Sequence, residues 1–325
     1  MKAAWIALTA LLVALPSAAK VLPEPTHNET ESVRAEFLDT PGFMNRWRVM
    51  LALDTRHLYG LTDTDTPDLR LAVFPGDLAG NEARMVDTRQ AGNPLAADRH
   101  ERVVSETLRA ITASGDGTRE VPFTTFSEVE AMRYMALTGH IPVATALVVT
   151  QRGEPLLAVW FKDDADAQPW YFSLKSVYRR VLREYAHRSP TGRLSGWHFL
   201  IHMAERGSPA ALVGRAATNL RDNNHSRTRE ITEWLRTAAR ADNALAIVLL
   251  GDMERNQEPQ SPAQHRECLE KALLQYAHAS QLGYVPAMQR IQEVEAELAA
   301  LASPVLEVAV NTMAPSAMAP LGLPE

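Results

Sequence analysis

One short pattern occurs three times between residues 197 and 302, and it constrains how the second half of the chain can fold. In each copy, small residues stand where one helix ends, a Gly or Asp-Asn turn follows, and a small residue enters the next helix. The turns are centred on Gly207, Asp242 and Gly283, so successive copies are 35 and 41 residues apart (207 to 242, 242 to 283). That spacing is typical of repeated helical hairpins, in which small residues let two helix backbones approach closely.

The repeat predicts six helices and the residues that hold them together. We expect helices over about 196–206, 209–221, 229–241, 244–256, 263–281 and 285–302. Ile231, Trp234, Leu235 and Ala238 form an i, i+3, i+4, i+7 stripe, so we expect Trp234 in the core and a cost of about 3–5 kcal/mol for Trp234→Ala. The residues expected to shape the repeats are Gly207, Ala211, Trp234, Ala238, Ala239, Ala246, Gly251, Gly283 and Ala287.

The second copy carries the most specific order of residues. From Trp234 to Gly251 it places an aromatic residue, a double Ala, a turn, an Ala and a Leu-Gly pair in sequence. This order resembles the Sel-like branch of the tetratricopeptide repeat family, although Asp242 replaces the usual turn Gly and the Leu-Gly pair is degenerate in the other copies. The resemblance extends over about residues 196–302. It implies a curved solenoid of stacked hairpins that acts as an interaction scaffold.

The two ends of the chain have the composition of segments outside the fold. Residues 1–19 combine a charged start, an apolar stretch at 3–15 and a small-residue site, which predicts a cleavable signal peptide and a periplasmic or secreted protein. This apolar stretch is shorter than the roughly 20 residues that a membrane span needs, and no Cys follows it for a lipid anchor. Composition also predicts a flexible lead-in at 20–40 and a disordered tail at 303–325.

For residues 41–190 the order of elements predicts an α+β domain with a mainly antiparallel sheet. We recognise no family in this domain. The expected strands are 46–54, 69–74, a hairpin of 144–150 with 156–161, and 170–174. The expected helices are 95–113, a helix opened by Ser127 and ending near 138, and 176–187. An all-α helical-hairpin solenoid over 195–302 follows, and we expect each part to have its own core.

Charge indicates the class of partner. The chain has a net charge of −6, which argues against a nucleic-acid binder. Residues 206–240 nevertheless hold seven Arg against three acidic residues. Since Arg grips carboxylates and phosphates, we predict a face for an anionic partner, either another protein with an acidic peptide or a glycan of the cell envelope. The alternative is a solvated helical face. The candidate residues are Arg206, Arg215, Arg229, Arg236 and Arg240.

The sequence gives no strong catalytic signal, and we predict no catalytic residue and no cofactor. The Gly-x-Ser-x-Gly elbow, the His-Glu-x-x-His zinc helix and the phosphate-binding Gly-Lys-Ser/Thr loop are all missing. His198 and His202 share a helix face and form a weak metal candidate with Glu205 or His187; a half-buried or surface pair is the favoured alternative. Two functions stay open. One is an interaction scaffold, and the other is an enzyme or small-ligand domain at 41–188 with the repeats as an accessory.

Overall fold

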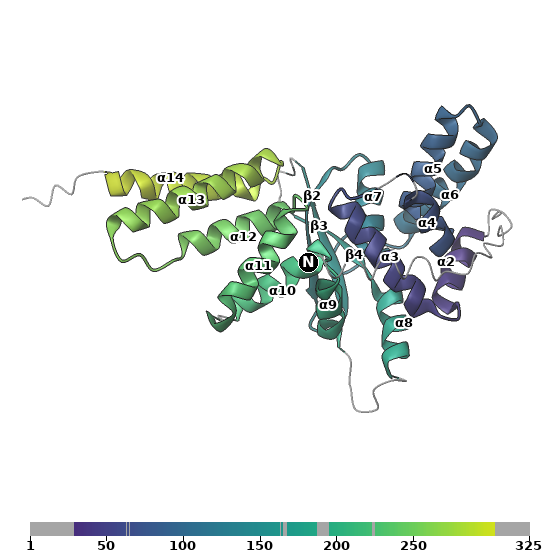
Figure 1. The fold of residues 1–325 in the computed structure, drawn as a ribbon, viewed down its shortest axis with the longest axis horizontal. Coiled ribbons are helices and arrows are strands. Elements are labelled where there is room, and N and C mark those ends of the chain that lie inside the picture. Colours follow the sequence, from purple (N-terminus) through teal and green to yellow (C-terminus); the bar gives the residue numbers. More distant parts are fainter. Residues whose placement is uncertain are drawn as a thin grey trace, which may run out of the picture.

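A computed structural model of the chain describes residues 29–62, 64, 66–162, 164, 168–186, 195–222 and 225–302. The predicted signal peptide, residues 20–28 of the predicted lead-in and the predicted tail lie outside this part. Helices predominate among the described residues and accompany one four-stranded sheet, so the α+β class is confirmed. In Figure 1 the sheet lies between the N-terminal helices on one side and the helical hairpins on the other.

In the part of the chain that the structure describes, five helices come before the first strand. They are α2 (Glu29–Asp39), α3 (Phe43–Leu58), α4 (Thr66–Val73), α5 (Leu78–Gln90) and α6 (Pro94–Ala113). Among them, α6 matches the helix predicted at 95–113: Asn93 caps it by accepting a hydrogen bond from the Ala96 amide, and Pro94 opens its first turn.

The strand predicted at 46–54 is wrong, because these residues lie inside α3. The buried residues Phe43, Trp47, Met50 and Leu51 follow the i, i+4, i+7, i+8 spacing of a helix. Other positions on α3 are buried as well. The apolar residues of this segment therefore also fit the alternating pattern of a strand. A short apolar segment that is buried on more than one side does not reveal its period.

Two further expectations at the N-terminus are wrong for related reasons. The strand predicted at 69–74 is mostly helix α4, in which the buried Arg70 makes ion pairs with carboxylates of neighbouring helices. The lead-in predicted to be flexible forms α2 from residue 29 onward. Phe37 of α2 enters the core and Arg34 is buried beside it, so packing with distant residues orders a segment that has weak periodicity of its own.

The sheet contains β1 (Phe123–Thr124), β2 (Pro142–Val149), β3 (Pro155–Phe161) and β4 (Trp170–Ser173) in the order β1-β4-β3-β2. The predicted hairpin is confirmed: β2 and β3 pair antiparallel with Ala146 opposite Ala158. The predicted third strand is also confirmed, since β4 pairs antiparallel with β3, and only β1 joins in parallel. The sheet is therefore mainly antiparallel, with helices α7 (Glu128–Leu137) before β2 and α8 (Lys175–Ala186) after β4.

The six helices predicted from the repeat are present within about two residues of their expected ends. They are α9 (Gly196–Glu205), α10 (Pro209–Arg221), α11 (Thr228–Ala239), α12 (Ala244–Arg255), α13 (Pro262–Gln281) and α14 (Pro286–Ala302), with a short 3₁₀ turn, η1 (His225–Arg227), before α11. The three turn residues share one backbone conformation, with φ of +83° at Gly207, +52° at Asp242 and +92° at Gly283. Asp242 is the one non-glycine residue with positive φ in the described part.

The residues expected to shape the repeats make close contacts. Ala211, Ala246 and Ala287 are fully buried just after the three turns. A Cβ at Gly251 would lie 2.6 Å from the Tyr276 ring, so glycine is needed where α12 meets α13. Ala238 is fully buried, whereas Trp234 and Ala239 are partly buried. The expectation that Trp234 is a core residue is therefore wrong: Ile231 and Leu235 fill the core, and Trp234 lies at its edge.

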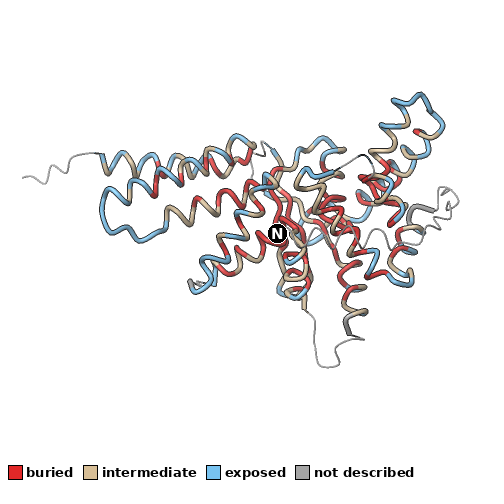
Figure 2. Tube along the Cα trace, in the orientation of Figure 1, coloured by how far each residue is buried: buried red, intermediate tan, exposed pale blue. Residues whose placement is uncertain are grey.

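The first hairpin has no core of its own, contrary to our expectation. Residues of α9, α10 and α11 belong to the same hydrophobic cluster as the sheet and the N-terminal helices. A second cluster joins α12, α13 and α14 to Val143 and Ala144 of β2. Figure 2 shows the buried residues concentrated along the sheet and on the helix faces that turn toward it.

The edge of the sheet explains this arrangement. Strand β2 lies at the edge, where unpaired backbone groups invite association with other chains. Here α10 approaches so closely that a Cβ at Gly214 would lie 1.9 Å from the Leu147 carbonyl oxygen, and Asn243 Nδ2 donates to the Thr145 carbonyl at 2.8 Å. The hairpins thus cover the edge of β2, with the turn of the second repeat satisfying one of its carbonyls.

Candidate functional site

A pocket of about 200 Å³ lies where β2 meets the N-terminal ends of α7, α10 and α12. Leu58, Met132, Pro142, Val143 and Pro209 form much of its apolar wall, and Glu128, Thr145, Asp242 and Asn243 provide polar groups. We call this cavity the Glu128 pocket. Two of the three repeat turns open directly onto it, so the feature that organises the second half of the chain also builds the pocket.

Glu128 is the centre of the polar contacts. Its Oε1 accepts from Thr145 Oγ1 at 2.7 Å and from the Ala210 amide at 3.1 Å, and its Oε2 accepts from Ser208 Oγ at 2.7 Å. Asn243 Nδ2 lies 2.9 Å from the same Thr145 hydroxyl. Ser208 and Asn243 are the N-caps of α10 and α12, so one carboxyl group joins α7, the sheet edge and the repeat turns.

Burial changes the acidity of this carboxyl group. Glu128 is 3% exposed, and loss of solvation raises its pKa to about 7. The hydrogen bonds from Ser208, Thr145 and the Ala210 amide oppose that rise but do not cancel it. At neutral pH the group is therefore divided between its ionised and neutral forms, whereas an ordinary glutamate is fully ionised.

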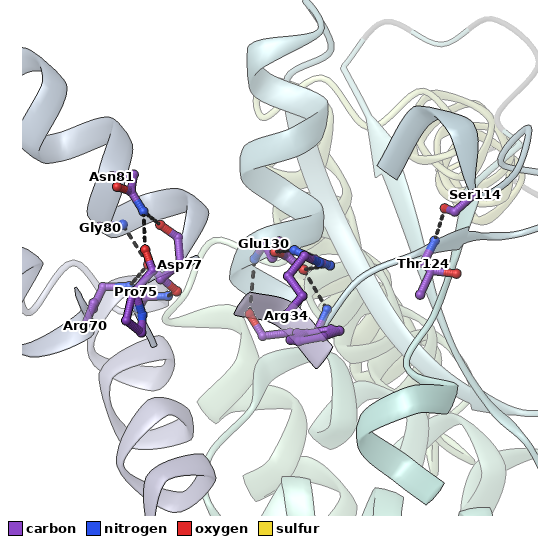
Figure 3. Close-up of polar contacts among 11 residues, drawn as sticks. Arg34, Arg70, Pro75, Asp77, Gly80, Asn81, Ser114, Thr124 and Glu130 are labelled. Atoms are coloured by element: carbon purple, nitrogen blue, oxygen red, sulfur yellow. Dashed lines mark hydrogen bonds and ion pairs between the residues drawn. The ribbon is translucent and has the colours of Figure 1, made fainter. Parts of the chain in front are cut away.

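Buried ion pairs hold the N-terminal side of the site. Arg34 of α2 donates to both carboxylate oxygens of Glu130 on α7, and the Phe126 amide donates to Glu130 Oε2 at 2.6 Å (Figure 3). Ser127 and Glu130 have the spacing of a capping box, in which each side chain accepts from the backbone amide of the other residue. Half of that motif is present, since Ser127 accepts from the Glu130 amide, but the Glu130 carboxylate binds Arg34 instead of returning to Ser127.

A second buried cluster fixes α3 against α4 and α5. Arg70 donates from Nε to Asp77 Oδ1 at 2.6 Å and from Nη2 to Asp54 Oδ1 at 2.7 Å. Asp77 is also the N-cap of α5 and accepts from the Gly80 amide (Figure 3). These charges are paired with one another and do not line the Glu128 pocket, although the charge of Asp54 acts on Glu128.

The five candidate arginines do not form one set. Arg206 Nη1 lies 2.9 Å from His202 Nδ1, and the Arg215 guanidinium lies 4.0 Å from the centre of the Trp234 ring in a cation–π contact. Both are therefore engaged inside the protein. Arg229, Arg236 and Arg240 are exposed, and the Arg229 side chain is 94% exposed.

The two candidate metal-binding histidines have separate contacts. His198 Nδ1 accepts from the Ser195 amide at 3.2 Å and caps α9. The His202 ring stacks on Trp47 with centroids 5.3 Å apart, and burial lowers its pKa to about 4. Both line a pocket of about 180 Å³ between α8 and α9 together with Glu205, whereas His187 lies outside the described residues. Within the described part, no three His, Cys, Asp or Glu residues are arranged to hold a metal.

The Glu128 pocket was not found from the sequence. From the sequence Glu128 is predicted only as the first residue after a helix cap. Its hydrogen-bond partners are Thr145 on β2 and the Ser208–Ala210 segment about 80 positions later, and Asn243 is connected to it through Thr145. The repeat is the indirect sequence signal for this pocket. Two equivalent turns of a hairpin array lie close to each other, so the residues of these turns are expected to share a surface.

We compared the chain with family models, with curated proteins and with solved structures, and none of the three comparisons found a match. In the part of the chain that the structure describes, no helix combines the length and apolar character that a bilayer span requires.

Proposed function

We propose that this protein is an exported interaction scaffold, periplasmic or secreted, whose helical hairpins bind another protein through an acidic peptide segment or bind an anionic glycan. Export rests on the signal sequence at residues 1–19, and the scaffold role on the Sel-like pattern of the repeats. The observation that carries the anionic partner is the exposed face of α11.

Helix α11 has two distinct faces. Ile231, Leu235 and Ala238 are buried against the core, whereas Arg229 and Arg236 are exposed seven residues apart on the same helix. From residue 227 to residue 240 the chain carries four Arg and two Glu, in a protein with a net charge of −6. A local cationic face on an acidic protein attracts anionic partners and repels basic ones.

The exposed arginines are only weakly neutralised. Arg229 Nε lies 3.6 Å from Glu233 Oε1, and both side chains are mostly exposed. A solvated pair of this kind is worth about 0–1 kcal/mol, so an incoming carboxylate replaces Glu233 at little cost. The proposed face therefore comprises Arg229, Arg236 and Arg240; Arg206 and Arg215, which contact His202 and Trp234, are left out of it.

An enzyme or ligand-binding domain confined to residues 41–188 has less support. Residues inside and outside that range line the Glu128 pocket: Leu58 and Thr145 lie within it, and Pro209 and Asn243 lie after it. At about 200 Å³ it is also smaller than the roughly 300–1,000 Å³ of most substrate pockets.

The experiment measures binding of a fluorescein-labelled oligo-glutamate peptide by anisotropy. We compare wild-type protein with the double variant Arg229→Glu, Arg236→Glu. The matched control is Arg102→Glu, Arg109→Glu, which reverses two exposed arginines seven residues apart on α6. We expect the α11 variant to lose binding and the α6 variant to keep it.

Salt provides the second readout. From about 0.01 M to about 0.15 M salt the screening length falls from about 30 Å to about 8 Å, so wild-type affinity should drop steeply. Equal binding by all three proteins, or affinity that does not change with salt, contradicts the proposal.

A further inference from the structure

The Glu128 pocket has an acidic lining that nothing in the proposed function uses. Two carboxyl groups line it, Glu128 in its interior and the exposed Asp242 in the turn before α12, and none of its lining residues is Lys, Arg or His. Most of the remaining wall is aliphatic, from Leu58, Met132 and Val143 among others. A cavity with hydrocarbon walls and carboxyl groups suits a ligand that has a hydrocarbon chain and a cationic end.

Glu128 retains capacity to bind such a cation. Its Oε1 accepts two hydrogen bonds, but its Oε2 accepts one, from Ser208. A carboxylate oxygen accepts about two, so one acceptor position of Oε2 is open. The largest influences on this carboxyl group are its burial, the three hydrogen-bond donors and the like charge of Asp54.

We propose that the Glu128 pocket binds a primary alkylammonium group, with the ammonium donating to Glu128 and the aliphatic chain lying against Leu58, Met132 and Val143. Asp242 adds a second negative charge that attracts the cation. This inference is independent of the α11 face, because it involves different residues and a ligand of opposite charge.

The volume limits the length of the ligand. An engineered apolar cavity of about 150 Å³ holds one benzene molecule. The pocket of about 200 Å³ therefore accepts a chain of roughly four to six carbons and excludes larger ring systems. n-Pentylammonium is the probe that follows from this size, and 1-pentanol is its uncharged counterpart.

Binding should depend on pH in a defined direction. The charged and titratable groups around Glu128 include Asp54 of α3, Tyr59 at the C-terminal end of α3, Arg240 at the end of α11 and Asp242 in the turn before α12. Burial keeps the pKa of Tyr59 well above its ordinary range, so Tyr59 stays neutral between pH 5 and pH 8. Burial also raises the pKa of Asp54 against the opposing charge of Arg70, so Asp54 is a second buried carboxyl group that loses its charge as the pH falls. The alkylammonium stays protonated over this interval, since amines of this kind titrate near pH 10. Binding should therefore follow the ionisation of the buried carboxyl groups, and the Glu128→Gln variant isolates the part that belongs to Glu128.

The experiment follows methyl resonances of the full chain by NMR during titration with n-pentylammonium and, separately, with 1-pentanol. We expect saturable shifts at Met132 and Val143 with the ammonium at pH 8, and an affinity at least about tenfold weaker at pH 5, where Glu128 is mostly protonated. Localising the shifts in the wild-type protein makes this readout independent of any variant.

Two variants complete the test. Glu128→Gln keeps the shape and removes the charge, and should weaken binding at pH 8 by at least about tenfold. Asp98→Asn removes one exposed carboxylate from α6 and should leave binding unchanged. Equal affinity for 1-pentanol, unchanged binding by the Glu128→Gln protein, or the absence of saturable shifts at the pocket overturns the proposal.

Discussion

Glu128→Gln gives the sharpest test of the polar centre that joins the repeats to the sheet. The two side chains have the same shape. The glutamine Oε1 can accept from Thr145 and the Ala210 amide, and its Nε2 can donate to Ser208 Oγ, which reverses the wild-type bond from Ser208. The variant therefore removes the ability to ionise with little change in shape. Any change in stability reports the cost of placing a charge in this buried position.

The size of the effect follows from the acidity of the group. Burial raises the Glu128 pKa from 4.5 to about 7, a difference worth about 3 kcal/mol. Because the pKa is higher in the folded protein, protonation of Glu128 favours the folded state. This contribution to the free energy of unfolding is fully present below about pH 4.5. That contribution is lost as pH rises through about 7. Relative to wild type, the glutamine variant should be equal near pH 4.5 and more stable by up to about 3 kcal/mol above pH 8.

Urea unfolding at a series of pH values measures this difference directly. Glu101→Gln is the matched control, since Glu101 is exposed and forms a surface ion pair with Arg89. Its difference from wild type should be small and nearly independent of pH. If the Glu128→Gln curve runs parallel to wild type from pH 4.5 to pH 8, the carboxyl group is not held in the environment described above and the reasoning fails.

Two further substitutions test how the hairpins are held. Gly214→Ala places a Cβ against the Leu147 carbonyl oxygen, where α10 meets the sheet edge, and should destabilise the protein by about 1–3 kcal/mol or more in urea unfolding. Leu235→Ala should cost about 2–5 kcal/mol because Leu235 is fully buried, and Trp234→Ala should cost less, because Trp234 is only partly buried. A larger loss for the tryptophan would mean that the edge of the core is misplaced.

The repeat region was the most predictable part of the fold. Its period placed the turns at Gly207, Asp242 and Gly283, and all three adopt the same left-handed conformation. The β2–β3 hairpin was also predictable, since its strands are short apolar runs separated by Gly153 and Pro155. Helix α3 was not, because burial on several sides gives an alternation that resembles a strand.

The site was less predictable than the fold, because it depends on contacts between distant segments. Burial raises the pKa of Glu128, and its hydrogen-bond partners are Ser208, Thr145 and the α10 amide. The residues next to Glu128 in the sequence do not predict those partners. Arg215 illustrates the reverse case. It belonged to a promising run of arginines, but the packing of α10 against α11 places it over Trp234. The sequence shows which charged residues are present, and tertiary packing determines which of them are exposed for binding.

The central claim is that α11 presents an anionic-partner face, and recovery of native partners tests it most directly. Wild-type protein, the Arg229→Glu, Arg236→Glu variant and the Arg102→Glu, Arg109→Glu control are each used to capture proteins and glycans from a periplasmic extract of the native host, at low and high salt. The account predicts a partner that wild type and the α6 control recover at low salt, that high salt releases, and that the α11 variant does not recover. Equal recovery of every partner by all three proteins at both salt concentrations would contradict it.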